Sequence, residues 1–250
     1  MILQENERLD EVNDSLKLIQ KTNGLTFGTD ALLLAAYLTP KYSCGAEFGG
    51  GTGIVSLLLL TRGKIDRIDA IEVQEEFAEL IKRNAELNGL SHRLTPIFSD
   101  VRDYKPQFEY DVVFTNPPYM KSSSGKSNSE EIKNIARHEI KGGVRDFLKA
   151  AKSALKYGGD FVAVYRTDRL IDIIAAMRES GIEPKRMTLV LADADSAPTI
   201  FLVEGRRGGK CGLRITKPLI IYRDKEHKLY TGDMQYIMDN GNFPKEFLKR

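Results

Sequence analysis

The stretch Asp111-Val112-Val113-Phe114-Thr115-Asn116-Pro117-Pro118-Tyr119 decides the fold. Its first five residues form an apolar run that predicts a buried strand of a parallel sheet. Each proline disfavours helical geometry in the residue before it, so the chain leaves this strand in an extended and stiff form. The polar tetrapeptide therefore stands at the carboxyl end of a strand, the edge where open α/β sheets bind their ligands.

The tetrapeptide 116–119 offers hydrogen-bond acceptors with few competing donors, because proline has no N–H. The side-chain oxygen of Asn116 and the carbonyl of Pro117 can together accept both hydrogens of a planar –NH2 group. The ring of Tyr119 can lie against the ring that carries this amine. This arrangement suits methylation of an exocyclic amine. Asn-Pro sequences are also common in ordinary turns, so the interpretation depends on the rest of the chain.

Around this stretch, strand and helix patterns alternate from residue 44 onward, which is typical of a parallel sheet with helices on both faces. The expected strands are residues 44–48, 67–71, 94–98, 111–115 and 160–165, followed by an antiparallel edge hairpin of 185–191 and 199–204. The expected helices are residues 31–38, 53–61, 74–87, 144–157 and 168–180. The fold class is therefore α/β, a Rossmann-like, doubly wound and mostly parallel sheet of seven strands. Residues 1–20 are expected to be helix-like or mixed.

The composition is that of an ordinary soluble globular protein, with 250 residues, 42% hydrophobic and 29% charged. The most apolar stretches are too short to span a membrane, and the N-terminus lacks the features of a signal peptide. The two cysteines, Cys44 and Cys211, form no disulfide framework and match no zinc-ligand spacing. We therefore expect a reduced, cytoplasmic setting with no membrane contact and no metal.

A glycine-rich stretch, Glu47-Phe48-Gly49-Gly50-Gly51-Thr52-Gly53, joins the first expected strand to its helix. Glycines allow a tight turn and close approach of a ligand, and the helix N-terminus adds partial positive charge. A dinucleotide site favours Gly-x-Gly-x-x-Gly, whereas here the spacing is Gly-x-Gly-x-Gly. An acid at position 47 suits a cationic amino-acid group better than a pyrophosphate. A nicotinamide dinucleotide and a bare turn both stay open at this point.

Two further acids follow the next two expected strands. Glu72 ends the second strand, where an acid can accept hydrogen bonds from both ribose hydroxyls. Asp100 follows the third strand and can accept a hydrogen bond from an adenine amine, with the backbone N–H of Val101 beside it. Each also has an ordinary interpretation, because acids are common at helix starts and in turns. Phe27 and Asp30 precede another helix, and Asp30 either caps it or lies beside a cofactor.

These groups fall in order at the carboxyl ends of the first four strands. The order resembles that of the class I S-adenosylmethionine-dependent methyltransferases, and the Asn-Pro-Pro-Tyr (NPPY) motif resembles their amino-methylating branch. The resemblance covers roughly residues 25–205. It implies S-adenosylmethionine as the cofactor, held by Glu47, Gly49, Gly51, Gly53, Glu72, Val73, Asp100, Val101 and Asn116. It implies catalysis by Asn116, Pro117 and Tyr119, which hold the target amine.

A narrower resemblance rests on four phrases, 16–20 (LKLIQ), 27–34 (FGTDALLL), 135–139 (IARHE) and 202–209 (LVEGRRGG). They resemble the bacterial tRNA adenine-N6 methyltransferases that modify the purine 3′ of the valine anticodon. That family implies adenine N6 in tRNA as the target and places Phe27 and Asp30 at the cofactor pocket. It usually begins its glycine loop with Asp-Leu-Gly and has Asn where Thr52 stands. We therefore expect a single methyltransferase domain, which consists of an N-terminal helical extension (1–40), a core (41–205) and a basic C-terminal extension (206–250).

The basic extension matches an uneven charge distribution. Residues 1–120 carry 12 Lys/Arg and 18 Asp/Glu, whereas residues 121–250 carry 25 and 17. The stretch 205–223 is rich in glycine and basic residues and contains no acid, which predicts a flexible basic loop. We expect RNA phosphate contacts from Lys121, Arg206, Arg207, Lys210 and Arg214. The alternative is a β-hairpin with solvated charges.

Three other functions stay open. A protein-glutamine N-methyltransferase uses the same tetrapeptide, because the glutamine amide is also a planar –NH2 group. Such enzymes resemble this chain but carry a sizeable N-terminal helical domain, whereas only 43 residues precede the first core strand here. An rRNA guanine methyltransferase is the second alternative. A non-catalytic RNA-binding module is the third, and the intact set of site residues argues against it. The oligomeric state is not predicted.

Overall fold

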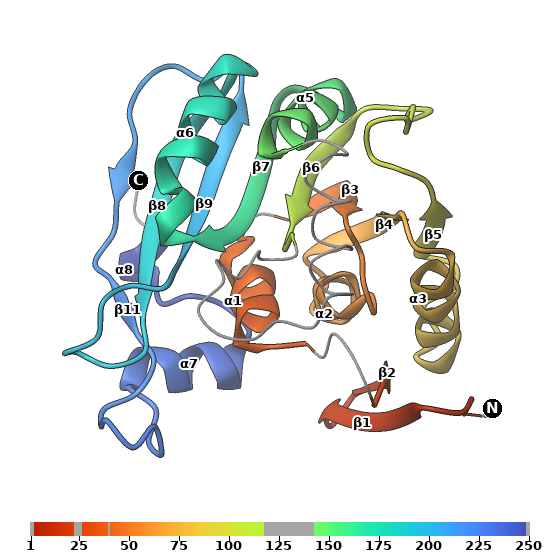
Figure 1. The fold of residues 1–250 in the computed structure, drawn as a ribbon, viewed down its shortest axis with the longest axis horizontal. Helices are drawn as coiled ribbons and strands as arrows, with labels where there is room; N and C mark the ends of the chain where they lie inside the picture. Colours follow the sequence, from red (N-terminus) through yellow and green to blue (C-terminus); the bar gives the residue numbers. More distant parts are fainter. Residues whose placement is uncertain (1–2, 23–26, 40, 118–142, 249–250) are drawn as a thin grey trace, which may run out of the picture.

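The computed structural model describes residues 3–22, 27–39, 41–117 and 143–248 and arranges most of them around one large sheet (Figure 1). Seven strands follow each other across it in the order β8, β9, β7, β6, β3, β4, β5. Their bounds are β3 (Tyr42–Phe48), β4 (Ile65–Glu72), β5 (Leu94–Phe98), β6 (Tyr110–Thr115), β7 (Leu155–Arg166), β8 (Ile182–Leu191) and β9 (Ile200–Arg207). The five strands β7, β6, β3, β4 and β5 pair in parallel with their neighbours in this order, and β9 runs antiparallel to both β7 and β8. The mostly parallel α/β sheet with its late antiparallel pair is confirmed.

The sheet is wider than the seven strands expected. Two short strands, β10 (Arg214–Ile215) and β11 (Leu219–Ile220), add to the outer edge of β8 and make nine. Two residues are too few for a period of alternation, so sequence patterns do not detect them. They bring the C-terminal segment with α7 (Gly232–Asn240) and α8 (Lys245–Leu248) against the sheet.

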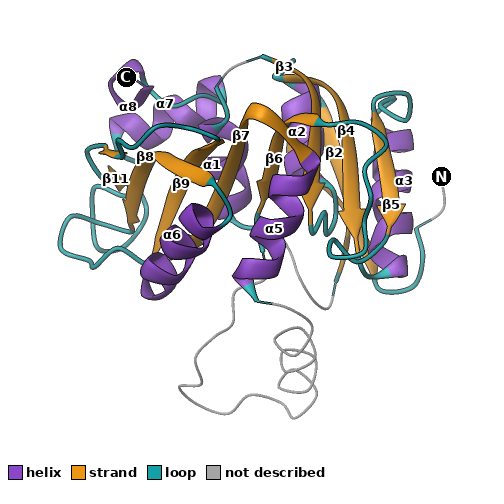
Figure 2. Cartoon of the chain, turned by 90° about the horizontal axis from the view of Figure 1, so that it is seen from above, coloured by secondary structure: helices purple, strands orange, loops and turns teal. Residues whose placement is uncertain are grey.

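Helices cover both faces of the sheet (Figure 2). One face packs against α5 (Val144–Ala154) and α6 (Leu170–Glu179), and the other against α1 (Thr29–Tyr37), α2 (Ile54–Thr61), α3 (Glu75–Leu87) and α7. Successive strand residues serve opposite faces: Val112 and Phe114 pack with α1 and α2, whereas Val113 packs with α5 and α6. Because both faces are covered, the middle of β6 (residues 112–114) and of β7 (residues 161–164) is a continuous run of buried apolar residues. None of the helices in the described segments is long and apolar enough to cross a membrane.

The expectation of a helix-like segment at residues 1–20 is wrong. Strands β1 (Glu7–Asn13) and β2 (Leu16–Lys21) form an antiparallel hairpin. The Asn13 side chain accepts a hydrogen bond from the backbone N–H of Ser15 at 3.0 Å, which builds the turn between them. The spacing of apolar residues in this segment suits a helix, but the turn residues and the contacts with α3 decide the outcome.

The helix expected at residues 144–157 ends earlier, at Ala154, and β7 begins directly after it. Gly158 adopts a left-handed conformation, φ 80°, inside β7, where the pairing register with β6 shifts between Tyr110 and Val112. Gly158 and Gly159, which directly follow the expected helix, are therefore part of an irregular strand.

Candidate active site

The strand ends come together at one edge of the sheet. In the pairing register, Phe48 lies opposite Ile71, and Glu72 lies opposite Phe98. The Thr115 hydroxyl at the end of β6 donates a hydrogen bond to the Phe48 carbonyl at 2.7 Å. The glycine loop, Glu72, the Asp100 turn and Asn116 therefore share one edge, as the sequence predicts.

The glycine loop leads from β3 to α2 and contacts the end of β4. Gly49 and Gly51 have φ values of 76° and 54°, which favour glycine. The Gly49 N–H donates to the carbonyl of Ile71 at 2.9 Å, and the Gly51 N–H donates to Glu72 Oε2 at 2.9 Å. A Cβ at Gly49 or Gly51 would meet no described atom within 4 Å. The loop thus leaves open space above its backbone, where a ligand can approach closely.

Glu47 lies under this loop, where it is 2% exposed. Its Oε2 accepts hydrogen bonds from the hydroxyl and the backbone N–H of Ser56, in the first turn of α2. Gly53, the residue that begins α2, has no side chain to cap the helix, so Glu47 supplies the capping acceptor. Burial raises the pKa of the Glu47 carboxyl from 4.5 to about 8. The capping role was not foreseen, and contact with the cofactor stays a prediction.

Glu47→Gln is expected to flatten the pH dependence of stability. At the Glu47 carboxyl, the native state binds more protons than the unfolded state between the unfolded pKa of 4.5 and the folded pKa of about 8. The stabilisation from this group is therefore complete below 4.5 and is lost as the pH rises through about 8. Glutamine keeps an acceptor oxygen for Ser56 but does not titrate. Urea unfolding across this pH range measures the effect, and equal slopes for the two proteins would contradict it.

Both carboxylate oxygens of Glu72 accept hydrogen bonds from nearby backbone N–H groups. Oε2 accepts from Gly51, and Oε1 accepts from the backbone N–H of Gln74 at 2.9 Å. Two apolar side chains beside it face solvent: Val73 is 37% exposed and Phe98 is 60% exposed. Exposed apolar surface at a strand end suits a flat heterocycle. Phe98 was missed from the sequence, although an aromatic residue directly before Ser-Asp was a usable signal.

The Asp100 turn offers an acceptor and a donor. The Asp100 carboxylate accepts hydrogen bonds from the backbone N–H of Arg102 at 3.0 Å and from its Nε at 2.8 Å. The sequence did not predict this partner. The backbone N–H of Val101 donates to no other residue that the structure describes. An adenine needs both a carboxylate for its amine and an N–H for its ring nitrogen, and the turn contains both.

Asn116 is connected to the start of α1. Its Nδ2 donates a hydrogen bond to Asp30 Oδ2 at 3.2 Å. The backbone N–H of Phe27 donates to Gln20 Oε1 at 2.9 Å, which anchors the segment that enters α1. The structure therefore brings Asp30 to Asn116, the first residue of the predicted catalytic motif. Pro118, Tyr119 and Lys121 lie outside the described residues.

The basic residues of the C-terminal half have a different placement from the one expected. Arg206 lies in β9 and forms an ion pair with Asp160 at 2.8 Å, and Arg207 pairs with Glu109 at 3.1 Å, just before β6 begins. Both lie at the sheet edge opposite Asn116. The flexible loop predicted for these arginines is wrong, because both belong to the ordered strand β9, where Arg206 pairs with Asp160 of β7 and Arg207 with Glu109.

Two more of the expected RNA contacts lie further along. Arg214, in β10, donates to the carbonyl of Phe247 at 2.7 Å, so it too lies in a strand rather than a loop. Lys210 is exposed, and its carbonyl accepts from Lys185 Nζ at 2.9 Å. Contact of any of these residues with RNA stays a prediction.

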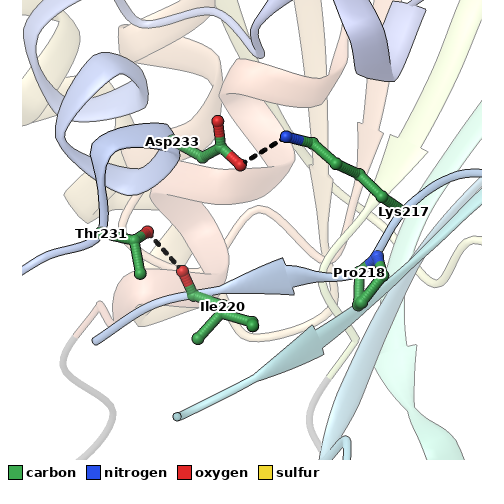
Figure 3. Close-up of a pocket in the computed structure, with 5 residues that line it drawn as sticks. All are labelled: Lys217, Pro218, Ile220, Thr231 and Asp233. Atoms are coloured by element: carbon green, nitrogen blue, oxygen red, sulfur yellow. Dashed lines mark hydrogen bonds and ion pairs between the residues drawn. The ribbon is translucent and has the colours of Figure 1, made fainter. Parts of the chain in front are cut away.

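A separate pocket of about 310 Å³ opens between β11 and α7 (Figure 3). Lys217 forms an ion pair with Asp233 at 2.8 Å, and the Thr231 hydroxyl donates to the carbonyl of Ile220 at 2.6 Å. The polar groups of this pocket thus satisfy one another. It includes none of the residues that the sequence predicts to be functional.

Several known proteins are similar to this chain. The methyltransferase small domain family matches residues 22–179. A curated relative from Aeromonas hydrophila, named tRNA1(Val) (adenine(37)-N6)-methyltransferase, is 30% identical over 189 residues, 74% of this chain and 78% of the relative.

Two solved structures share the fold. A predicted O-methyltransferase from Agrobacterium tumefaciens has a TM-score of 0.70 at 22% identity and covers 86% of this chain and 98% of its own. M. jannaschii TYW2, crystallised with AdoMet, has a TM-score of 0.56 at 14% identity and covers 82% and 87%.

Proposed function

The chain belongs to the methyltransferase small domain family, and from this we infer that it transfers a methyl group from S-adenosylmethionine to the N6 amine of an adenine in tRNA. Membership makes the chain an S-adenosylmethionine-dependent methyltransferase. The finer assignment rests on Asn116, which follows β6 at the edge that also carries the glycine loop. An amide oxygen at that point can hold a substrate –NH2 group beside the methyl donor.

The residues at the edge fit the cofactor. Gly49 and Gly51 leave open space over their backbone, and Glu72 can offer its carboxylate to the ribose hydroxyls. Asp100 and the Val101 N–H suit the adenine, with Val73 and Phe98 supplying apolar surface. When bound, S-adenosylmethionine supplies an electrophilic methyl group on a sulfonium.

The chain itself orients the nucleophile. The target base leaves its stack to reach the site, at a cost of about a few kcal/mol, and stacking on Tyr119 is proposed to return roughly 1–3 kcal/mol of it. Asn116 Oδ1 and the Pro117 carbonyl accept the two amine hydrogens, which draws the nitrogen lone pair out of conjugation with the ring. With S-adenosylmethionine bound, these two acceptors would direct the amine nitrogen at the methyl carbon, so that transfer would leave S-adenosylhomocysteine and release one amine proton to solvent. Positioning and electrostatics supply the catalysis.

Support for tRNA comes from the curated relative, which is named for position 37 of tRNA1(Val). The excess of basic residues after position 120 suits a polyanionic partner. A tRNA substrate also agrees with the cytoplasmic setting predicted from the sequence. Protein glutamine and rRNA guanine offer similar –NH2 groups, so the substrate has to be measured.

Incubation with labelled S-adenosylmethionine and, separately, unmodified bacterial tRNA, rRNA and total protein tests the function. We expect label in tRNA only, and nuclease digestion with mass spectrometry should identify it as N6-methyladenosine. Label in protein glutamine or in rRNA guanine would contradict the proposed substrate. Absence of any transfer while S-adenosylmethionine binds would favour a binding module.

A further inference from the structure

The contact between Asp30 and Asn116 determines the orientation of the Asn116 side-chain amide. Asp30 Oδ2 accepts a hydrogen bond from Asn116 Nδ2 at 3.2 Å, across 86 positions of sequence. An ionised carboxylate only accepts hydrogen bonds, so the amide atom that faces it must be the donor, Nδ2. The acceptor atom Oδ1 then occupies the opposite end of the carboxamide plane.

We propose that Asp30 is a positioning residue, which holds the Asn116 carboxamide with its oxygen directed to the substrate amine. This inference rests on the proposed function. The two ends of an amide have nearly the same shape, and a half-turn about the last side-chain bond exchanges them. The exchanged form presents an N–H group to the hydrogens of the substrate amine, which cannot hold that amine. The Asp30 carboxylate opposes this form because a carbonyl oxygen would then face a negative charge.

The position of Asp30 is itself determined by its surroundings. Its second oxygen, Oδ1, accepts from the backbone N–H of Ala31 at 3.0 Å in the first turn of α1. Helix α1 is buried through Ala31, Leu33 and Leu34, so this turn has little freedom. Gly28 leaves the necessary room, because a Cβ there would lie 2.7 Å from Asp30 Oδ1.

The geometry separates two roles for this residue. From the sequence, Asp30 is expected to border the cofactor pocket, which predicts a loss of cofactor affinity on substitution. In the structure, one carboxylate oxygen accepts from helix α1 and the other from Asn116, the residue proposed to hold the substrate amine, so Asp30 is linked to that residue directly. A residue that acts through Asn116 predicts instead a loss of kcat with little change in cofactor affinity.

Asp30→Ala tests the proposal. We expect kcat at saturating substrate to fall about 10- to 100-fold, since a small misplacement of a reacting group can have effects of this size. The Kd for S-adenosylmethionine, measured by calorimetry, should stay within about twofold. Asp172→Ala is the matched control. Asp172 is also an acid in the first turn of a helix, α6, on the other face of the sheet, and its loss should leave kcat unchanged.

Gly28→Ala supplies a second test that keeps Asp30. The backbone of Gly28 is extended, φ −113° and ψ −178°, so alanine introduces no backbone strain there. The new methyl group displaces the Asp30 carboxylate, and we expect a fall in kcat of at least about threefold with an unchanged Kd for S-adenosylmethionine.

The outcomes separate the two levels of inference. A tenfold rise in the Kd with an unchanged kcat in Asp30→Ala would overturn the positioning role and make Asp30 a cofactor ligand. An unchanged kcat and Kd would also overturn it. If the native enzyme methylates another amine instead of tRNA adenine, the proposed substrate fails, and the same ratio of effects can be measured with that amine.

Discussion

Asn116→Ala is expected to lower kcat for methyl transfer by about 100- to 1000-fold, the range found when one preorganised hydrogen-bonding group is removed from an active site. The side chain is placed for this role by the hydrogen bond from Thr115 to the end of β3 and by its own bond to Asp30. Alanine keeps the strand and the loop but removes the acceptor. The nitrogen lone pair of the substrate then stays conjugated with its ring.

Single-turnover rates and calorimetric binding separate the possible effects of this substitution. The Kd for S-adenosylmethionine should change little, because the glycine loop, Glu72 and Asp100 are untouched. Asn116→Asp makes a sharper variant: it keeps an acceptor oxygen but sets a carboxylate about 3 Å from Asp30, where like charges disfavour each other. We expect this variant to be slow as well. A kcat within threefold of the native value in Asn116→Ala would disprove the assigned role.

The core of the sheet could be predicted because its strands have recognisable local sequence patterns. Residues 94–98 form β5 with both ends as expected, and residues 111–115 fall within β6. These runs are short, apolar and bounded by polar or turn residues, and both faces of the sheet are covered by helices. The order of acids and glycines along the chain then fixed the edge, because the carboxyl ends of parallel strands lie together.

The predictions that failed concern residues whose contact partners are distant in the sequence. The apolar spacing of Leu9, Val12, Leu16 and Ile19 suits a helix, yet these residues form a hairpin whose second strand docks on α3. Similarly, the sequence predicts that Arg206 is solvated or binds phosphate, but Asp160 lies opposite it on the neighbouring strand β7 and forms an ion pair with it. Tertiary pairing overrides local preference in both cases.

The meeting of the predicted site residues at one sheet edge could be predicted, but their hydrogen-bond partners could not. Glu47, Glu72 and Asp100 stand at the expected edge, yet each already has a partner: Ser56, the backbone of the glycine loop, and Arg102. No local sequence pattern predicts such contacts. The bond between Asp30 and Asn116 spans 86 positions and follows only when α1 is packed beside the end of β6.

Asn84→Ala is expected to destabilise the protein by about 3–5 kcal/mol, through loss of the bonds that dock the N-terminal hairpin. Asn84 is fully buried on α3. Its Oδ1 accepts from the Ile19 N–H at 2.7 Å, and its Nδ2 donates to the carbonyls of Ile19 at 3.0 Å and Thr52 at 2.9 Å. Three buried backbone groups lose their partner on substitution, at about 1–3 kcal/mol each, with partial relaxation.

Asn88→Ala is the matched control, because Asn88 repeats the same pattern one helical turn later. It accepts from the Lys17 N–H at 3.0 Å and donates to the Lys17 carbonyl at 2.7 Å, and both bonds are exposed although the residue is half-buried. Four residues of helix advance about 6 Å and two residues of strand about 7 Å, so the two asparagines match alternate residues of β2. Water can replace the bonds of Asn88, so we expect a loss of about 1 kcal/mol.

Urea unfolding of both variants measures the difference. Because Asn84 also binds the carbonyl of Thr52 in the glycine loop, its loss should weaken S-adenosylmethionine binding as well, whereas Asn88→Ala should not. Equal destabilisation by the two substitutions would contradict the buried docking role. A large loss of stability with unchanged cofactor affinity would restrict the role of Asn84 to the hairpin, because the connection to the glycine loop would then carry no binding energy.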